Sequence, residues 1–532
     1  MELATNRGRF SPRLNPLAAC LAAALALSAG SAAANPGATS QQQLQARELA
    51  SLPARMMDGS VPRPPPWQRQ TPLPPLSERH HPVPHEMAPV PAGAIAVTNC
   101  DDSGAGSLRD ALENVAVDGD TVDLTGLSCS TITLTTGSIF FFQDSITIQG
   151  PGLGGLILTG GPSRYPPLMH GGLGTLSVNG MIVMDGAKYF TDSQVVDARG
   201  GCIFSGGYVA LNDSEVKYCT AQNSGSTYGA LGGAVYGTTG VSLSNSTIFG
   251  SSAYAANTFG DGGAIFTPGS VTLLDSFISG NTASNGGGGV RALDGGILKY
   301  SQVGNNEAAT VGGVYIMGNA TILYSTIAGN VAGLGGGLWL NGSGATIPVT
   351  LANSTVSGNN AANSDIGGIF LYGGGQTARV ANSTIAFNTT HFAGSTKYGA
   401  GLRSILSTID LESNIIAGNT NDSGGGAVND DVDGSASVTL IGANNLIVVS
   451  SITPPADTIS ADPKLGELES NGGETQTHAI HITSPAINAG NNEAGAATDQ
   501  RGSGYPRVIG GQADIGAFEF DFDDVIFRNG FD

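Results

Sequence analysis

The sequence predicts an all-β fold in which short strands stack as the coils of a solenoid. A phrase of serine, one arbitrary residue and an aliphatic residue recurs eight times between Asp213 and Ile415, at intervals of 24 to 32 residues. The serines are Ser214, Ser246, Ser276, Ser301, Ser325, Ser354, Ser383 and Ser413. A self-similar period in this range is typical of a solenoid, in which each unit buries its apolar edge only by stacking on its neighbours. The units hold short apolar runs separated by glycine, asparagine and aspartate, so each unit is expected to be a β-coil.

Two further columns follow the same period. Paired glycines usually introduce a column made of Cys202, Ala234, Ala264, Val290, Val314, Leu338, Ile369 and Leu402. Five coils place an asparagine three residues after the aliphatic position, at Asn281, Asn306, Asn330, Asn359 and Asn388. Serine and asparagine bond readily to nearby backbone. We therefore expect each to form a ladder that bonds to turn backbone or to the next coil.

The first 34 residues have the composition of a secretory signal. They combine three arginines, an apolar stretch from Leu17 to Leu27 and three consecutive alanines at 32–34, which are the three parts of such a signal. Residues 35–94 hold 13 of the 26 prolines and show little apolar periodicity. They are predicted to be a disordered or extended linker. The protein is therefore expected to be exported.

Residues 95–460 are predicted to hold the coils and an N-terminal cap. Ser107 with Asp110 three residues later marks a helix start, and apolar residues at 108, 111, 112 and 115 give that helix one apolar face. A cap is expected because the open end of stacked coils exposes unpaired strand edges. Residues 461–520 depart from the coil pattern, and residues 521–532 form an acidic and aromatic tail.

The chain is acidic and sparsely charged. Asp and Glu outnumber Lys and Arg by 42 to 22, which gives a formal net charge of −20. Nucleic acid is excluded as a partner, because phosphate binding needs clustered Lys and Arg. After the signal, no apolar run approaches the ~20 residues of a membrane span, so the mature chain is expected to lack a transmembrane segment. The oligomeric state stays open.

Four cysteines remain after the signal, which permits two disulfides in an exported protein. We favour the local pairs Cys100 with Cys129 and Cys202 with Cys219. The alternative is that Cys202 and Cys219 only fill stack positions as small apolar residues. Metal ligation is disfavoured, because neither pair has the spacing of a zinc site or a nearby histidine.

Several motifs resemble known families. Gly-Ser-Leu-Arg-Asp-Ala-Leu at 106–112 is similar to the motif that opens many exported bacterial right-handed parallel β-helix proteins. The phrases Gly-Gly-Ala-Ile at 262–265 and Ile-Ser-Gly-Asn at 278–281 resemble polymorphic outer membrane protein repeats. The stretches 461–465, 471–478, 484–490, 499–502 and 514–519 together resemble the choice-of-anchor Q domain of bacterial surface proteins. The resemblance implies a pectate lyase-like, right-handed parallel β-helix with a short capping helix, secreted or displayed at the bacterial cell surface or outer membrane. It departs from the families in two places: no cysteine immediately precedes the helix motif, and only 12 residues follow Phe520.

A polysaccharide lyase or glycoside hydrolase acting on acidic polysaccharide is the alternative function, since parallel β-helices host such enzymes. The Gly-His-Gly and Arg-x-Lys phrases of polygalacturonase-like hydrolases do not occur. A lyase base could come from Arg291 and Lys299, which fall in one coil. Paired carboxylates could come from Asp261 and Asp294 on adjacent coils. In both cases a solvated charge or a plain acidic turn is the competing interpretation.

The run Asn429-Asp430-Asp431-Val432-Asp433-Gly434 matches the first half of a calcium loop. Asn429, Asp431 and Asp433 would supply oxygens at positions one, three and five, with glycine at six. Position twelve is Leu440 instead of glutamate. Calcium is therefore the one cofactor to consider, with a plain acidic turn as the alternative.

One column of the coils is rich in rings. The residues directly after the second column are Ile203, Val235, Ile265, Arg291, Tyr315, Trp339, Phe370 and Arg403. If their neighbours point inward, alternation turns Arg291, Tyr315, Trp339, Phe370 and Arg403 outward as a flat strip suited to sugar rings or a protein partner. The alternatives are a loop that covers the strip or a strand facing the other way. We therefore predict a non-catalytic, adhesin-like surface protein that binds carbohydrate or a cell-surface partner.

Overall fold

The computed structural model describes residues 91, 93–191, 196–342, 349–363, 366–373, 377–391, 399–405, 408–422, 426–435 and 437–522. They belong to one compact unit, Val61–Asp532. The predicted signal, nearly all of the linker and most of the acidic tail lie outside the described residues. Among the described residues, no helix is long and apolar enough to cross a membrane.

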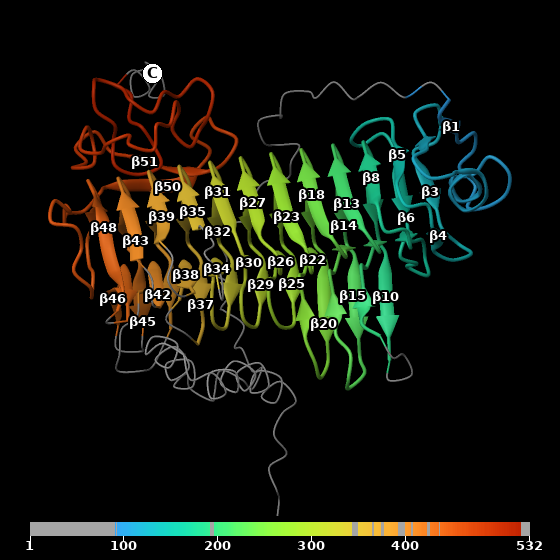
Figure 1. Ribbon diagram of the computed structural model, residues 1–532, viewed down its shortest axis with the longest axis horizontal. Coiled ribbons are helices and arrows are strands. Elements are labelled where there is room, and N and C mark those ends of the chain that lie inside the picture. Colours follow the sequence, from blue (N-terminus) through green and yellow to red (C-terminus); the bar gives the residue numbers. More distant parts are fainter. Residues whose placement is uncertain are drawn as a thin grey trace, which may run out of the picture. The chain divides into compact units, whose positions relative to one another are not determined.

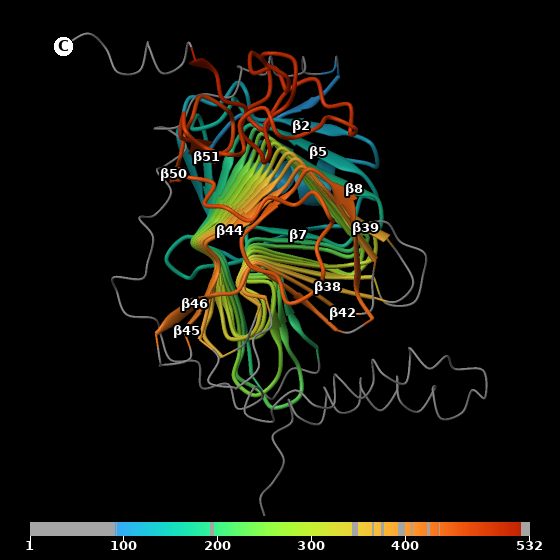
Figure 2. The ribbon, with the colours of Figure 1, turned by 90° about the vertical axis from the view of Figure 1, so that its left-hand side faces the viewer.

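The described coils are built from parallel sheets that run along a common axis (Figures 1 and 2). A typical coil passes through sheet C, then sheet A, sheet B and sheet D before it returns to sheet C one level further along. Parallel connections of this kind are almost always right-handed. The chain therefore forms the predicted right-handed parallel β-helix.

Sheets A and B form two sides of the coil. Sheet A comprises β1 (Ile95–Ala96), β2 (Thr121–Asp123), β5 (Ile146–Gln149), β8 (Thr175–Asn179), β13 (Tyr208–Asn212), β18 (Gly240–Ser244), β23 (Ser270–Leu274), β27 (Gly296–Lys299), β31 (Ala320–Leu323), β35 (Val349–Ala352), β39 (Thr377–Ala381), β43 (Thr408–Glu412) and β48 (Thr439–Ala443). Sheet B comprises β3 (Thr131–Thr133), β6 (Ile157–Thr159), β9 (Ile182–Met184), β14 (Glu215–Lys217), β19 (Thr247–Phe249), β24 (Phe277–Ser279), β28 (Gln302–Gly304), β32 (Thr326–Ala328), β36 (Thr355–Ser357), β40 (Thr384–Ala386), β44 (Ile415–Ala417) and β49 (Leu446–Ile447).

Sheet C closes the coil, and sheets D and E extend below it. Sheet C comprises β4 (Ile139–Phe141), β7 (Leu168–His170), β12 (Ile203–Ser205), β17 (Val235–Gly237), β22 (Ile265–Thr267), β26 (Val290–Ala292), β30 (Val314–Met317), β34 (Leu338–Asn341), β38 (Ile369–Tyr372), β42 (Leu402–Ile405) and β47 (Val432–Gly434). Sheet D comprises β10 (Ala187–Phe190), β15 (Thr220–Asn223), β20 (Ser252–Ala255), β25 (Thr282–Ala283), β29 (Glu307–Ala308), β33 (Val331–Ala332), β37 (Asn360–Ala361), β41 (Thr389–Thr390), β45 (Thr420–Asp422) and the antiparallel β46 (Ala427–Asn429). Sheet E comprises β11 (Ala198–Arg199), β16 (Ala230–Leu231) and β21 (Gly260–Asp261).

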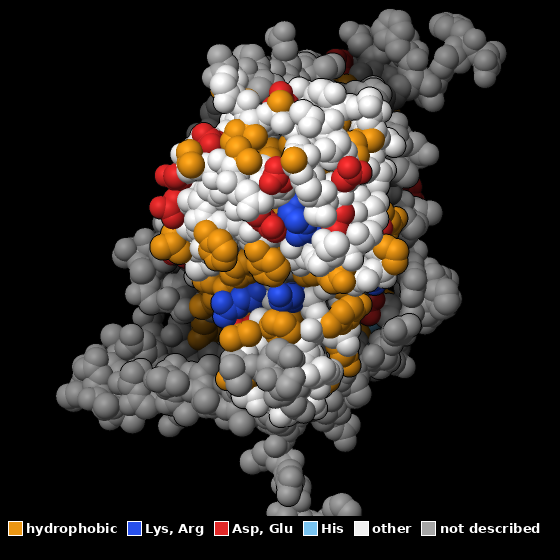
Figure 3. Space-filling model, turned by 90° about the vertical axis from the view of Figure 1, so that its right-hand side faces the viewer, with side chains coloured by type: hydrophobic (Ala, Val, Ile, Leu, Met, Phe, Trp, Pro, Cys, Tyr) orange, Lys and Arg blue, Asp and Glu red, His pale blue; other side chains and the backbone are white. Residues whose placement is uncertain are grey.

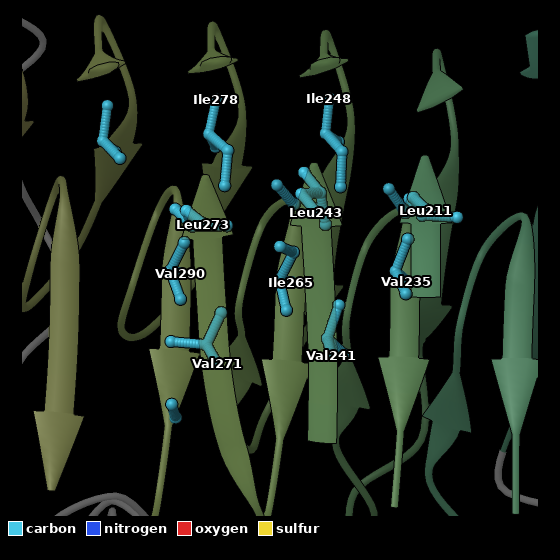
Figure 4. Packing of buried hydrophobic residues seen from close by; sticks show 14 of the residues in the cluster. Leu211, Val235, Val241, Leu243, Ile248, Ile265, Val271, Leu273, Ile278 and Val290 are labelled. Carbon is cyan, nitrogen blue, oxygen red and sulfur yellow. The ribbon is translucent and has the colours of Figure 1, made fainter. Parts of the chain in front are cut away.

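The core is a set of aliphatic columns inside the coils. Figure 4 shows Leu211, Val241 and Leu243 of sheet A facing Val235 and Ile265 of sheet C. Sheet B completes the packing with Ile248 and Ile278. All of these side chains are buried, and burying each contributes about 1.5–3 kcal/mol. Each coil supplies only a few such residues, so stability depends on stacking, as the repeat predicts.

The serine repeat forms the predicted ladder between sheets A and B. Each backbone N–H donates to the serine Oγ of the next coil, as from Ser276 to Ser301 (3.1 Å) and from Ser325 to Ser354 (3.1 Å). At the eighth position the sequence prediction is wrong by one residue. Ser383 donates to Asn414 Oδ1 (3.1 Å), whereas Ser413 lies at a turn position with positive φ. Asparagine takes over because its side-chain oxygen reaches the same donor.

The asparagine ladder lies where sheet B turns towards sheet D. The side-chain oxygen of each member accepts two bonds from the member before it, as Asn359 Oδ1 does from Asn330 N (3.0 Å) and Asn330 Nδ2 (2.9 Å). The structure extends the predicted ladder through Asn419, whose N and Nδ2 both donate to Asp431 Oδ1 at 2.9 Å. Members of this ladder are fully buried, with at most 1% of their surface exposed.

The sequence alignment of sheet C is wrong by one residue in three coils. Val290 and Val314 pair in register with Ile203, Val235 and Ile265, one place after Cys202, Ala234 and Ala264. In the later coils the residue directly before the first aliphatic residue of the strand is glycine. A Cβ on Gly313 would lie 3.0 Å from Asn330 Nδ2, and one on Gly337 would lie 3.0 Å from Asn359 Nδ2. The number of residues between the Gly-Gly pair and the strand therefore differs between coils, and counting from that pair misplaces the strand.

Both predicted disulfides are present. Cys100 bonds to Cys129 beside the cap, with Cα atoms 6.5 Å apart, and Cys202 bonds to Cys219 with Cα atoms 5.5 Å apart. Cys219 donates its backbone N–H to Ser251, which in turn donates to Asn281. The second disulfide therefore lies at the start of the asparagine ladder, before Asn281.

A short helix caps the N-terminal end, as predicted. It consists of α3 (Leu108–Asp110) and a π-helical turn, η4 (Ala111–Val115), and the Ser107 side chain accepts a bond from Asp110 N. The contacts of Arg109 account for the arginine in the Gly-Ser-Leu-Arg-Asp motif. It donates to Gly137 O (2.6 Å) and Ser138 O (2.7 Å) and pairs with Asp102 at 2.8 Å. This end still shows a band of apolar side chains (Figure 3), and the exposed residues of the cap region include Phe140 and Phe142.

Acid is expected to loosen this cap through Asp102. Burial would raise the pKa of Asp102, but hydrogen bonds donated by Arg109, Thr136 and Thr135 hold it below its usual range. The stability that Asp102 contributes is therefore present above its unfolded pKa of ~3.9 and is lost as pH falls towards its lower folded pKa. Asp102→Asn should cost about 2 kcal/mol at neutral pH and should flatten the loss of stability below about pH 4.

Calorimetric unfolding of the wild type and of Asp102→Asn across this pH range measures the difference. Asp101→Asn is the matched control, because Asp101 is exposed. Identical pH dependence in wild type and Asp102→Asn would contradict the assignment.

Residues 461–522 pack on the outer face of sheet B in the later coils (Figure 1, red). A hairpin of β50 (Leu465–Glu469) and β51 (Thr477–Ile480) starts the region. Gln500 accepts from Thr355 Oγ1 (2.6 Å), and Ser357 Oγ bonds to His478 Nε2 (2.8 Å). Ile415 and Leu446 pack against apolar residues of this region, including Ile515 and Phe518. The region therefore seals part of sheet B.

Candidate functional site

The candidate site is a column of side chains on the outer face of sheet C, here called the aromatic column. Along each strand the flanking residues point into the core and the central residue points outward. Val314 and Ile316 are fully buried, for example, whereas Tyr315 between them is half-buried. In register order the column is Phe140, Met169, Phe204, Tyr236, Phe266, Arg291, Tyr315, Trp339, Phe370, Arg403 and Asp433.

The five residues singled out from the sequence occupy consecutive places in this column. The one-residue register error hid the rest of it, because Ile203, Val235 and Ile265 face the core and are fully buried. Their outward neighbours are Phe204, Tyr236 and Phe266, which the sequence analysis missed. The sequence feature that could have revealed them is the aromatic residue that directly follows the aliphatic residue in those coils.

The rings form two runs separated by Arg291, stacked in the first run and tilted or edge to face in the second. In the first run the ring centroids of Phe204 and Tyr236 are 5.6 Å apart, and those of Tyr236 and Phe266 are 5.8 Å apart. In the second run Tyr315 and Trp339 are 5.7 Å apart, and Trp339 and Phe370 are 4.8 Å apart. Because parallel strands are spaced ~4.8 Å apart, the column offers about one ring for each coil.

Neighbouring residues cover part of the column. Tyr236 and Phe266 are buried in a cluster with Leu231, against which Phe259 and Leu293 pack. Phe370 is buried with Ile366 and Ile405. Phe204, Arg291, Tyr315, Trp339 and Arg403 remain half-buried. The accessible stretch with consecutive members is therefore Arg291, Tyr315 and Trp339, bounded by Phe266 and Phe370.

Arg291 is held in place from two sides. Its Nη1 lies 2.6 Å from the Oδ1 of Asp261, whose side chain is only 5% exposed. Its guanidinium carbon lies 4.9 Å from the centroid of the Tyr315 ring. Asp261 Oδ1 also accepts bonds from Asn285 Nδ2 (2.8 Å) and Gly286 N (3.0 Å). Arg291 is therefore a paired cation whose flat group extends the stack of rings.

The other arginines near the column have similar settings. Arg199 pairs with Asp197 at 3.0 Å and lies 5.2 Å from the Tyr236 centroid. Arg403 lies 5.9 Å from the Phe370 centroid, and its register partner on the next coil is Asp433. Arg199 is thus a paired cation beside a ring, and Arg403 lies beside a ring with an aspartate at its register position on the next coil.

The groups considered for catalysis do not converge. Arg291 is on sheet C, whereas Lys299 is on sheet A and lies 5.1 Å from the Tyr300 ring centroid. Asp261 lies on β21 of sheet E, whereas Asp294 follows the sheet C strand of the next coil and is exposed. The fold therefore does not bring together the two residues of either proposed catalytic pair.

The calcium-loop residues have other contacts. Asp431 Oδ1 ends the asparagine ladder, and its Oδ2 accepts from Val449 N at 3.0 Å. Burial raises the pKa of Asp431 to about 6, against the hydrogen bonds from Asn419 and Val449. Asp433 accepts a bond from Ser451, and Asn429 lies on β46. Within the described ranges, no three His, Cys, Asp or Glu side chains gather closely enough to hold a metal ion. Calcium binding at this loop stays a prediction.

Comparisons with known proteins give structural neighbours only. No family model and no curated protein matches the sequence. The structure is similar to that of pectate lyase Pel9A, with 13% identity and a TM-score of 0.36 over 80% of this chain and 96% of that chain. It is also similar to alginate lyase AlyF-OU02 in complex with G6, with 12% identity and a TM-score of 0.31 over 74% of this chain and 92% of that chain. At these identities the likeness concerns the fold alone.

Proposed function

We propose that this protein is an exported, non-catalytic β-helix that binds carbohydrate through the aromatic column, in adhesion at or near a cell surface. The observation that carries the proposal is the accessible stretch of Arg291, Tyr315 and Trp339 on a rigid sheet. Rings offer a large apolar area at a low cost in side-chain entropy, and they suit ligands with apolar faces and polar edges. The sheet holds them in position without a ligand, so little binding energy is spent on ordering.

The non-catalytic part of the proposal rests on how the reactive groups are placed. General acid–base chemistry needs a proton donor or acceptor within hydrogen-bond reach of the reacting atom. On the accessible stretch the charged side chain is Arg291, which is paired with a buried carboxylate. We expect no release of reducing or unsaturated sugars when the protein is incubated with neutral or acidic polysaccharides, with or without calcium. Sustained turnover in this assay would contradict the non-catalytic assignment.

Trp339→Ala is expected to abolish most of the binding. Truncating a central aromatic contact typically costs about 2 kcal/mol or more, which is about thirty-fold in Kd. Trp339→Phe should keep most of the affinity because the ring is retained. Isothermal titration with oligosaccharides selected on a glycan array measures both variants.

Tyr254→Ala is the matched control for this experiment. Tyr254 is 49% exposed on β20 of sheet D, away from the aromatic column. The Tyr254→Ala variant should bind the oligosaccharide with the affinity of the wild type. Equal losses in Trp339→Ala and Tyr254→Ala, or no loss in Trp339→Ala, would overturn the proposed site.

A further inference from the structure

We infer that the accessible stretch of the aromatic column takes an uncharged glycan chain, laid along the axis of the coils with about one sugar residue for each coil. This inference rests on the proposed function and names the class of ligand for the same site. It departs from the acidic polysaccharide considered from the sequence. Three features of the column carry it: paired cations, neutral phenols and the spacing of the rings.

The cation of the accessible stretch, Arg291, is already matched by a carboxylate. It is held by Asp261 at 2.6 Å, and Arg199, which lies beside the column on sheet E, is held by Asp197 at 3.0 Å. Binding a glycan carboxylate would require either arginine to leave its partner. Leaving the buried Asp261 without a cation would be costly, because an unpaired buried charge is strongly destabilising. The chain also carries a net charge of −20, which repels a polyanion at long range.

The other side chains of the accessible stretch, Tyr315 and Trp339, and the flanking Tyr236 and Tyr372 are uncharged. Burial raises the pKa of Tyr236, and burial together with the nearby Tyr315 raises that of Tyr372, so both phenols stay protonated at neutral pH. The indole nitrogen of Trp339 is buried and has no hydrogen-bond partner among the described residues. The part of Trp339 that solvent reaches is therefore ring carbon. Such a surface packs against the C–H faces of a sugar ring and offers little to a carboxylate.

The arrangement of the rings sets the direction of the chain. Tyr315 and Trp339 lie on successive coils with centroids 5.7 Å apart and rings tilted by 49°, and the planar group of Arg291 extends the row by one more coil. This step is close to the length of one sugar residue in an extended chain. The accessible stretch covers three coils, or about 15 Å at the spacing of parallel strands. Phe266 and Phe370, both buried, limit it at its two ends.

Direct binding to matched neutral and acidic oligosaccharides tests the inference. The probes are cello-, xylo- and manno-oligosaccharides against oligogalacturonates and oligoalginates of equal length, titrated at low and at high NaCl concentration. We expect the neutral probes to bind with a Kd that salt changes by less than about two-fold, since no ion pair forms with the ligand. Tighter binding of the acidic probes, weakened by salt, would overturn the inference and leave the proposed function standing. Absence of binding in both classes would overturn both.

Asp261→Asn provides the complementary arm. It removes the carboxylate that neutralises Arg291 and should raise the affinity for oligogalacturonate at low salt by about ten-fold, an effect that high salt removes. The affinity for neutral probes should stay within about three-fold of the wild type. Asp197→Asn is the matched control, because it unmasks Arg199 beside the buried Tyr236, outside the accessible stretch, and it should leave the affinity for both classes of probe within about three-fold of the wild type. A folded variant without the gain would contradict the role given to the paired carboxylates.

Discussion

Asn359→Ala is expected to lower the free energy of unfolding by about 4 kcal/mol. The Asn359 side chain accepts bonds from Asn330 N and Nδ2, and it donates to Asn388 Oδ1 (2.9 Å) and Ile327 O (3.0 Å). Alanine supplies none of these bonds. The N–H of Asn330 would lose its acceptor, and each buried polar group left unsatisfied costs about 1–3 kcal/mol. The cavity left by the amide adds to the loss.

The effect of Asn359→Ala should be local as well as large. In a solenoid each coil contacts only its neighbours, so the coils on either side should open first. Hydrogen exchange should show the Asn330 amide losing protection more than amides of the first coils do. Asn319→Ala is the matched control, because Asn319 is exposed, and it should change stability by less than about 0.5 kcal/mol. Equal effects of the two substitutions would contradict the ladder.

The ladders explain which parts of the fold could be read from the sequence. The serines from Ser214 to Ser383 repeat because they are joined from coil to coil by the same hydrogen bond, from a backbone N–H to the next serine Oγ. The period is therefore visible in the sequence. Asn414 replaces serine where the sequence offers Ser413 one place earlier. Choosing between them requires the backbone conformation, which puts Ser413 at positive φ. Repetition therefore predicts the architecture, whereas substitutions that preserve a hydrogen bond are found only in the structure.

The aromatic column shows a similar division. Arg291, Tyr315 and Trp339 could be placed outward by alternation alone. The burial of Phe370 by Ile366 and Ile405 could not, because the residues that bury it lie on other coils or other segments of the same coil. The pairing of Arg291 with Asp261 joins residues 30 positions apart in different sheets. The class of ligand that we propose rests on whether this cation is paired, so the sequence alone could suggest a binding strip but not the ligand class proposed for it.

The C-terminal region departs from the coil pattern in the sequence, but its packing could not be predicted from the sequence. Gln500 bonds to Thr355, 145 residues earlier in the chain, and Gln476 bonds to Gln302 over 174 residues. No local pattern encodes contacts at such separations. The motif around Asp499 and Arg501 forms a buried pair at 2.7 Å, with Arg501 stacked on the rings of Tyr505 and Phe518. These motif residues therefore stabilise the region that covers sheet B.

Arg507→Met is expected to destabilise this region by about 3–5 kcal/mol, because it removes one partner of a buried charged network. Arg507 is fully buried and donates to the carbonyl oxygens of Gly516 (2.9 Å) and Asp514. Its guanidinium also lies 3.5 Å from Glu519. Without the cation, Glu519 and Asp514 remain in the interior with only backbone donors. Hydrogen exchange over residues 499–519 and thermal unfolding should both report the loss.

The pH dependence and a double variant separate a charge effect from a packing effect. Burial raises the pKa of Glu519 to about 7 against the opposing influence of Arg507, so removing Arg507 should raise it further. A carboxyl whose folded pKa exceeds its unfolded value costs stability as pH rises between the two values. The Arg507→Met variant should therefore have its lowest free energy of unfolding above pH ~7, and it should regain stability as pH falls towards ~4.5. Adding Glu519→Gln should restore part of the stability at neutral pH, whereas Arg379→Met, whose side chain is 40% exposed, should cost less than about 1 kcal/mol. If Arg507→Met is equally unstable at both pH values and Glu519→Gln restores nothing, the loss comes from packing and not from the unpaired carboxylate.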